Sequence, residues 1–301
     1  MNMPEKVRIV DVGPRDGLQS EKLIVLTETK IQLIHRLAAA GIQSVESGAF
    51  VSPKWVPQMS DSDDVLKGIT RVAGTSYPVL VPNLKGFERA RLANVEEIAL
   101  FSAASETFSF KNTNCTINES IDRAFEVCEA GLREGMKVRG YISCALGCPY
   151  EGEIDIFKVA KLASELNKMG CYEISLGDTI GIGTPIKAKN MVSAVANLVP
   201  MDKLALHFHD SYGQALANIL ACLELGVSTI DSAVSGLGGC PYAPGASGNV
   251  ATEDVLYMLN GLDVETGIDF KAVISAGEYI CNALGRATTS KVSQAFLATS
   301  Q

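Results

Sequence analysis

Short apolar runs rich in β-branched residues recur along the chain, and segments with helical periodicity separate them. The runs predict eight strands, at residues 7–12, 44–50, 77–81, 97–102, 138–143, 172–176, 204–209 and 229–235. The periodic segments predict helices at residues 28–40, 117–135, 156–169, 185–198 and 214–225, with two more near 252–262 and 270–284. Several of these helices end beside a glycine, which adopts the left-handed conformation of a helix C-cap without steric cost.

Strands that alternate with helices predict a parallel sheet, because parallel neighbours need long crossover connections. Eight such units favour an α/β fold of the (β/α)8 TIM-barrel type with a C-terminal helical extension. An open dinucleotide-binding sheet is disfavoured, since no Gly-x-Gly-x-x-Gly follows the first strand. We expect one catalytic domain over residues 1–301, with the barrel and a glycine-rich lid loop over about 7–248 and helices packed on the barrel over about 249–301. In such a barrel, catalytic residues follow the strand ends.

Composition narrows the class of protein. The 301 residues are 47% hydrophobic and 20% charged, which is typical of globular chains and excludes disordered and fibrous ones. The net charge of −8 disfavours nucleic acid and anionic membranes as partners. No apolar stretch is long enough for a membrane span, and the polar residues 1–6 resemble neither a signal peptide nor a transit helix. Eight cysteines without disulfide or zinc spacing indicate reduced thiols and a cytoplasmic location.

Two of the three histidines, His207 and His209, lie two positions apart at the end of the seventh predicted strand. Alternate residues of a strand face the same side, so both imidazoles converge, which predicts a metal site. Imidazoles with a carboxylate suit Zn, Mn, Fe or Co, whereas a site completed by carboxylate, amide and water oxygens suits Mg or Mn. A metallohydrolase would carry such a pair on the first strand and need further histidines. The third histidine, His35, lies in the first predicted helix, which disfavours that class.

Charged residues also lie in or directly after three other predicted strands. Arg15 and Asp16 follow the first strand, where they could form only a salt-bridged turn. Glu46 lies among apolar residues of the second strand, and Asp178 follows the sixth. Buried carboxylates are costly unless they are paired or metal-bound, although local backbone donors could satisfy both. With the histidines, these groups would form a ring of acids and imidazoles around one barrel mouth, which predicts an active site.

A glycine-rich segment, residues 236–249, follows the eighth strand and contains Cys240. Its glycines could cradle a phosphate or form a mobile lid. A thiol that is exposed when a lid is open and buried when it is shut suits an acid or base more than a packing residue. Asn249, at the end of the segment, could cap the next helix or offer an amide oxygen to a metal.

Several long motifs resemble those of the 3-hydroxy-3-methylglutaryl-CoA lyase family. They are Val-Gly-Pro-Arg-Asp-Gly-Leu-Gln at 12–19, Phe-Val-Ser-Pro-Lys-Trp-Val-Pro-Gln at 50–58, Gly-Tyr-Ile-Ser-Cys-Ala-Leu-Gly-Cys-Pro-Tyr-Glu-Gly at 140–152, Glu-Ile-Ser-Leu-Gly-Asp-Thr-Ile-Gly at 173–181, His-x-His-Asp at 207–210 and Gly-Gly-Cys-Pro-Tyr-Ala at 238–243. The resemblance runs from about residue 7 to about residue 295. It implies a TIM barrel that cleaves (S)-3-hydroxy-3-methylglutaryl-CoA to acetyl-CoA and acetoacetate with Mg²⁺ or Mn²⁺, the chemistry of leucine degradation and ketone-body formation.

The resemblance also implies roles for eight residues: Asp16, His207, His209 and Asn249 as metal ligands, and Arg15, Glu46, Asp178 and Cys240 as the rest of the catalytic site. Breaking the C2–C3 bond removes the proton of the tertiary hydroxyl and leaves C2 as a thioester enolate. We expect Arg15 to stabilise the thioester oxygen and Asp16 or His207 to relay the hydroxyl proton. Cys240 would protonate the departing carbanion, and the carboxylates of the second and sixth strands would orient these groups.

The implied substrate is a small acyl-CoA, with Arg15, Asn83 and Lys85 as candidate substrate-binding residues and a homodimer as the common assembly among relatives. A condensing acyltransferase of the isopropylmalate or homocitrate synthase type, which joins an acyl-CoA to a 2-oxoacid, shares the Arg-Asp and His-x-His motifs and is the nearest alternative. The cysteine loop separates the lyases from these synthases. A barrel that only binds a CoA ester or a metal is a second alternative, and the intact set of acids and imidazoles argues against it.

Overall fold

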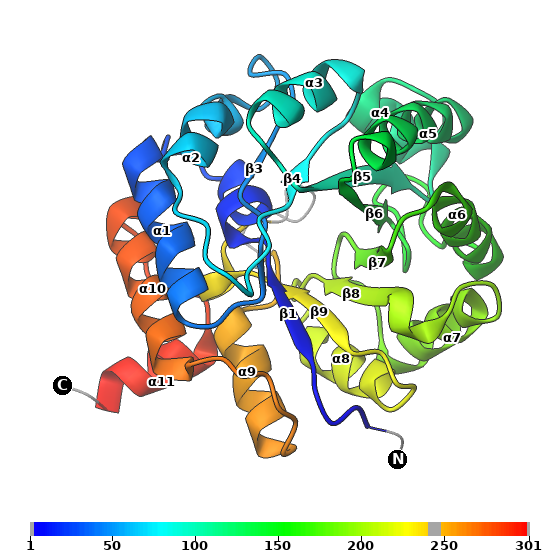
Figure 1. Cartoon of the computed structure of the whole chain (residues 1–301). Helices are drawn as coiled ribbons and strands as arrows, with labels where there is room; N and C mark the ends of the chain where they lie inside the picture. The colour runs from blue at the N-terminus through cyan, green and yellow to red at the C-terminus, as the bar shows by residue number, and fades with distance from the viewer. Residues whose placement is uncertain (1–2, 240–247, 300–301) are drawn as a thin grey trace.

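A computed structural model describes residues 3–239 and 248–299 of the chain and shows parallel strands closed into a barrel (Figure 1). The strands are β1 (Arg8–Asp11), β2 (Ser44–Val45), β3 (Gly48–Ala49), β4 (Val79–Leu80), β5 (Glu97–Ala103), β6 (Lys137–Ser143), β7 (Glu173–Asp178), β8 (Leu204–Phe208) and β9 (Thr229–Ser232). β2 and β3 are two halves of the second predicted strand. Because β2 pairs with β1 and β3 pairs with β4, the ring closes. The predicted TIM-barrel class is therefore confirmed.

Helices surround this ring of strands (Figure 1). They are α1 (Thr27–Ala39), α2 (Ser62–Gly68), α3 (Leu84–Leu92), α4 (Glu106–Thr113), α5 (Ile117–Arg133), α6 (Ile156–Met169), α7 (Pro185–Ala196), α8 (Ala215–Leu223), α9 (Thr252–Gly261), α10 (Phe270–Leu284) and α11 (Lys291–Thr299). All seven predicted helices are present. The prediction missed α2, α3, α4 and α11, each of seven to nine residues, because so few turns do not establish a helical period.

Two predicted strands differ from the structure in detail. The second is interrupted at Glu46 and Ser47, where the ladder passes from the β1 side to the β4 side. The eighth was predicted to reach residue 235 but ends at Ser232, and a short 3₁₀ turn, η4 (Val234–Gly236), follows it. Ser235 in this turn has a positive φ of 56°, which a β-strand cannot contain.

The two faces of β6 show how the barrel separates apolar from polar residues. A Cβ built at Gly140 would meet Leu166 of α6 at 3.0 Å, so this position faces the helices. Its neighbours Arg139 and Tyr141 therefore face the barrel interior, because successive strand residues alternate sides. Both are buried. On this strand the polar side chains thus face the inside of the ring, where the site is built.

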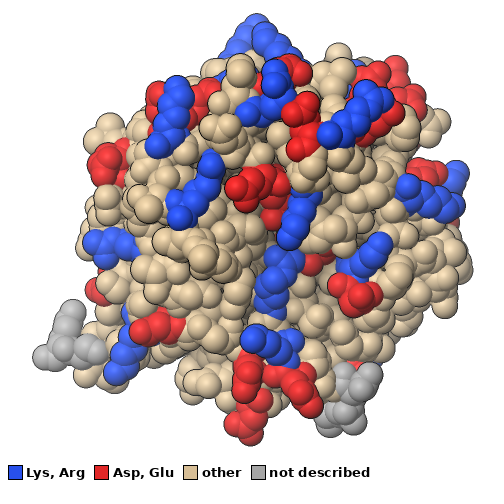
Figure 2. Space-filling view, in the orientation of Figure 1, with Lys and Arg blue, Asp and Glu red and all other residues tan. Residues whose placement is uncertain are grey.

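The C-terminal helices lie at one side of the barrel. α10 packs against α1, and α9 contacts both α10 and α11 (Figure 1). None of the helices in the described ranges has the length and apolarity required to cross a lipid bilayer. On the face shown in Figure 2, acidic and basic side chains are interspersed among uncharged ones.

Candidate functional site

The first strand end presents its charged pair on a fixed turn. β1 is followed by η1 (Gly13–Gly17), a single π-helical turn. The buried Asp11 carboxylate accepts hydrogen bonds from the backbone N–H of Gly13 at 2.8 Å and from the Thr252 hydroxyl at 2.7 Å. Position 13 requires glycine, because a Cβ there would lie 2.7 Å from Asp11 Oδ1. These contacts hold the Arg-Asp pair over the barrel interior.

Arg15 joins two carboxylates from different strand ends. Its Nη1 donates to Asp16 Oδ1 at 2.7 Å, and its Nη2 lies 2.8 Å from Glu46 Oε2. The guanidinium carbon lies 5.6 Å from the ring centre of Tyr141. Burial lowers the pKa of Arg15, but Glu46 and Asp16 outweigh burial and raise it. Burial also raises the pKa of Glu46, against the effect of Arg15. The predicted turn is salt-bridged, and its cation also pairs with the second strand.

The histidine pair meets this turn at the barrel mouth. Asp16, His207 and His209 each place one possible ligand atom within 4.8 Å of the others. His207 Nε2 lies 3.8 Å from Asp16 Oδ2, and Asn249 Nδ2 donates to the same oxygen at 2.9 Å. His209 and Asn249 are also joined by a backbone bridge. The structure therefore brings together all four residues predicted as metal ligands.

Asn249 does not cap the following helix, which was one of its two predicted roles. The N-cap of α9 is Ala251, and the Asn249 amide instead donates to Asp16 and to the Leu237 carbonyl at 3.2 Å. The third histidine, His35, belongs to α1 and accepts a hydrogen bond from the Thr70 N–H at 2.8 Å.

The cluster fits a divalent cation. Burial would raise the pKa of Asp16, but Arg15 and the two imidazoles lower it to about 2. Burial and the neighbouring His207 lower the pKa of His209 to about 4. At neutral pH the cluster therefore offers a carboxylate and a neutral imidazole, the states that bind metals. His209 Nδ1 is buried without a hydrogen-bond partner among the described residues. One carboxylate, two imidazoles and an amide form a donor set for divalent metals.

Asp178 lies at the end of β7 and is held by local backbone donors. Its carboxylate accepts hydrogen bonds from Gly183 N–H at 2.8 Å and Ile182 N–H at 3.2 Å. Burial raises its pKa to about 6, against these hydrogen bonds and the nearby His207. Asp178 thus belongs to the barrel mouth: its backbone carbonyl accepts the His209 N–H at 3.3 Å, although no side-chain hydrogen bond within the described part of the chain joins its carboxylate to Asp16 or the histidines.

The structure does not join the remaining candidates to this cluster. Asn83 and Lys85 are exposed at the start of α3, where the Asn83 side chain accepts the Gly86 N–H and caps the helix. No hydrogen bond or ion pair within residues 3–239 and 248–299 connects either to Asp16 or the histidines. Cys240 lies outside the described residues.

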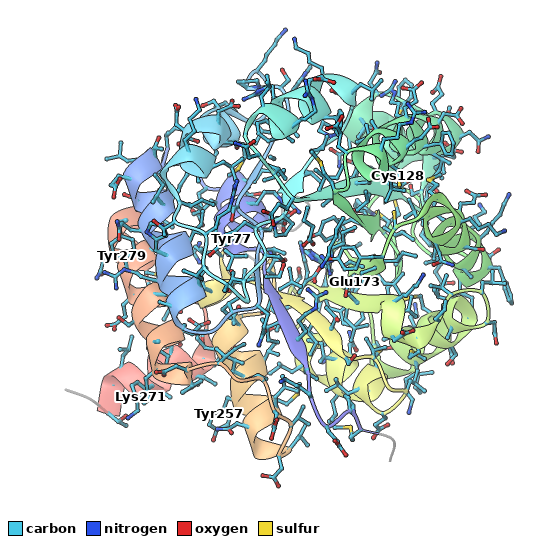
Figure 3. All side chains as sticks on the ribbon, viewed as in Figure 1. Tyr77, Cys128, Glu173, Tyr257, Lys271 and Tyr279 are labelled. Atoms are coloured by element: carbon cyan, nitrogen blue, oxygen red, sulfur yellow. The ribbon has the colours of Figure 1, made fainter. Side chains whose placement is uncertain are left out.

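Sequence reasoning missed a buried polar network beneath the cluster. Asp231 of β9 lies beside His207, with its Oδ2 3.2 Å from His207 Nδ1. Two nitrogens of Arg139 donate hydrogen bonds to the Asp231 carboxylate, at 2.6 and 3.1 Å. Arg139 Nε also donates to Glu173 at 2.6 Å, and Figure 3 shows Glu173 inside the ring of strands. Ser175 donates to Asp231 at 2.7 Å. The available signal was the run of polar residues at alternate positions of two apolar strands, 139 and 141, and 173 and 175.

Known proteins resemble this chain over almost its whole length. A model of the family described as HMGL-like matches residues 6–280. The mitochondrial hydroxymethylglutaryl-CoA lyase of Mus musculus is 58% identical over 293 residues, which cover 97% of this chain and 90% of that protein. The 3-hydroxy-3-isohexenylglutaryl-CoA/hydroxy-methylglutaryl-CoA lyase of Pseudomonas aeruginosa is 55% identical over 298 residues, which cover 99% of each. The crystal structure of hydroxymethylglutaryl-CoA lyase from Pseudomonas aeruginosa superimposes with a TM-score of 0.98 at 55% identity and covers 99% of this chain and 100% of that chain.

Proposed function

This chain belongs to the HMGL-like family of hydroxymethylglutaryl-CoA lyases and cleaves 3-hydroxy-3-methylglutaryl-CoA to acetyl-CoA and acetoacetate, and we propose that the residues at its barrel mouth carry out this reaction. The observation that carries the proposal is the meeting of Asp16, His207 and His209 within 4.8 Å, with Arg15 against the same aspartate. The condensing acyltransferase alternative is not favoured, since relatives above 50% identity are lyases.

Asp16, His207, His209 and Asn249 would hold a divalent cation, Mg²⁺ or Mn²⁺. When bound, such a cation supplies Lewis-acid stabilisation of negative charge on the substrate hydroxyl oxygen. The buried His209 Nδ1, which has no hydrogen-bond partner in the part of the chain that the structure describes, and the lowered pKa of Asp16 support this assignment. The Arg15 and Asn249 side chains each contact one oxygen of Asp16 and so orient its carboxylate.

Arg15 would stabilise the thioester oxygen on which charge develops as the C2–C3 bond breaks. Its burial supports this role, because a hydrogen bond to developing charge is stronger where water is excluded. Glu46 and the face of Tyr141 hold the guanidinium in place. Arg15 therefore does not need to reorganise when the enolate forms.

Two proton transfers complete the reaction. Asp16 or His207 would accept the proton of the tertiary hydroxyl, since both face the same point of the cluster. Cys240 would return a proton to the departing carbanion, and its motif in the glycine-rich segment supports this role. Asp178, held by two backbone N–H groups, would orient the site from the β7 end.

Further assignments rest on the family resemblance and on composition. We propose one catalytic domain over residues 1–301, a homodimer, and contacts of Asn83 and Lys85 with the CoA moiety. The acidic net charge of −8 supports the absence of a nucleic-acid partner. The seven described cysteines are free and buried, which supports a reducing compartment such as the cytoplasm. Leucine catabolism is the pathway that we propose for this chemistry.

The test is release of acetoacetate and acetyl-CoA from 3-hydroxy-3-methylglutaryl-CoA by the purified protein, with EDTA-treated and Mg²⁺- or Mn²⁺-restored samples side by side. We expect equal amounts of both products, and only with metal. H207A should abolish release, while H35Q, which changes a histidine of α1, should not. No release in the metal-restored sample, with turnover of acetyl-CoA and a 2-oxoacid instead, would overturn the assignment in favour of condensation.

A further inference from the structure

We infer that Asp231 is a positioning residue that fixes the tautomer of His207 and so aims its Nε2 at the Asp16–His209 cluster. The inference rests on the metal site of the proposed function and extends it to a residue one strand away. Two observations carry the inference: Nδ1 is the ring nitrogen of His207 that faces Asp231, and the Asp231 carboxylate can only accept hydrogen bonds.

The Asp231 carboxylate is surrounded by hydrogen-bond donors. Both oxygens of Asp231 face donors: Oδ1 accepts from Arg139 Nη2 at 2.6 Å, and Oδ2 accepts from Arg139 Nη1 at 3.1 Å and from the Ser175 hydroxyl at 2.7 Å. Asp231 is 1% exposed and Arg139 is fully buried. A carboxylate paired with a guanidinium in this bidentate way is ionised and carries no proton to donate.

The His207 imidazole faces this carboxylate through one ring nitrogen. His207 Nδ1 lies 3.2 Å from Asp231 Oδ2. Since the carboxylate can only accept, the hydrogen must be on Nδ1, which in the neutral ring leaves a lone pair on Nε2. That atom points toward the cluster, 3.8 Å from Asp16 Oδ2. Nδ1 is then held by Asp231, and Nε2 is free to face the cluster.

Strand pairing and buried ion pairs hold Asp231 in place. The strand register places Asp231 beside His207 in neighbouring strands, and Arg139 is fixed from its other side by Glu173. Arg8 also pairs with Glu173, so the network continues to the start of β1. Each charged residue of this network is buried or partly buried and has an ionic partner. The network therefore holds the Asp231 carboxylate against His207 Nδ1.

The variant D231N tests this inference. The amide would keep its oxygen toward Arg139 and turn its NH₂ group toward His207, so the imidazole would accept on Nδ1 and carry its hydrogen on Nε2. We expect Mn²⁺ affinity, measured by titration of the metal-free protein, to fall about 10- to 100-fold. Long-range ¹H–¹⁵N spectra of the metal-free protein, at a pH where the ring is neutral, should show the Nδ1–H tautomer in the wild type and its loss in D231N. D231E should recover part of the affinity.

The matched control is E173Q, which disturbs the same buried network through Arg139 but does not touch His207. It should lose thermal stability while keeping both the tautomer and the Mn²⁺ affinity of the wild type. Equal losses of affinity in E173Q and D231N, or an Nε2–H tautomer in the wild type, would overturn the inference. The wild-type spectrum needs no variant and decides the matter if D231N does not fold. Absence of Mn²⁺ binding by the wild type would instead contradict the metal site of the proposed function.

Discussion

Replacement of Arg15 by lysine removes the planar guanidinium that contacts carboxylates from two strands. In the wild type, separate nitrogens of Arg15 contact Asp16 at 2.7 Å and Glu46 at 2.8 Å. The lysine ammonium is a single point charge and has no planar fork, so it cannot reproduce this geometry. R15K should therefore keep a positive charge in the site but lose its fixed position.

The magnitude follows from the loss of a preorganised donor. One such donor contributes about 10²- to 10³-fold in rate, or about 2.7–4 kcal/mol of transition-state stabilisation. We expect R15K to lower kcat by this factor and R15M to lower it at least as far. In R15M the fully buried Glu46 also loses its cation, and breaking a buried pair costs about 3–5 kcal/mol of stability.

The assay is acetoacetate release at saturating 3-hydroxy-3-methylglutaryl-CoA with metal present, accompanied by denaturant unfolding of each variant. Unfolding separates loss of chemistry from loss of fold. R91K is the matched control, because Arg91 is an exposed residue of α3 paired with Glu88. If R15K is folded and retains near-normal kcat, Arg15 does not stabilise charge in the transition state, and the reasoning is refuted.

Four further predictions concern Glu253 of α9, the Gly183 backbone, the Cys240 thiol and the metal. Burial raises the pKa of Glu253 from 4.5 to about 8, so its contribution to stability is present in full below pH 4.5 and is lost as the pH rises to about 8. Glu253 should therefore add a fall of about 1.4 kcal/mol per pH unit to the unfolding free energy across this window; E253Q should lower the slope by this amount in denaturant unfolding, and an unchanged slope would contradict the shift. In G183A the new Cβ would lie 2.7 Å from Asp178 Oδ2. We expect kcat to fall and the free energy of unfolding to decrease by about 1–3 kcal/mol, and a variant with both values unchanged would show that this contact is not tight. C240S should slow acetoacetate release by about 10²- to 10⁴-fold if the thiol is the general acid, and wild-type turnover would exclude that role. EDTA should lower both activity and the midpoint of thermal unfolding, and Mn²⁺ should restore both; a midpoint independent of metal would argue against the Asp16–His207–His209 site.

Much of the fold was readable because strands and helices impose different periods on the sequence. Eight apolar runs predict the eight positions of the ring, and the rule that strand ends meet at one face is enough to bring Arg15, Asp16 and His207 together. The same rule brought Asp178 to the barrel mouth. Short helices such as α2 and α3 were missed, since two turns carry too few positions for a period.

The sequence alone determined which residue types stand at the strand ends, and hence the chemistry available at the mouth. Only the tertiary structure decided which of them touch. Asp231 meets His207, 24 residues earlier in the chain, through the register of two neighbouring strands, and it meets Arg139, 92 residues earlier, from a strand that it does not pair with. Likewise, Asn249 turns its amide to Asp16, 233 residues away, instead of capping α9. Periodicity states which face a side chain occupies, but the barrel's register and closure set its neighbours, and these depend on packing between distant segments.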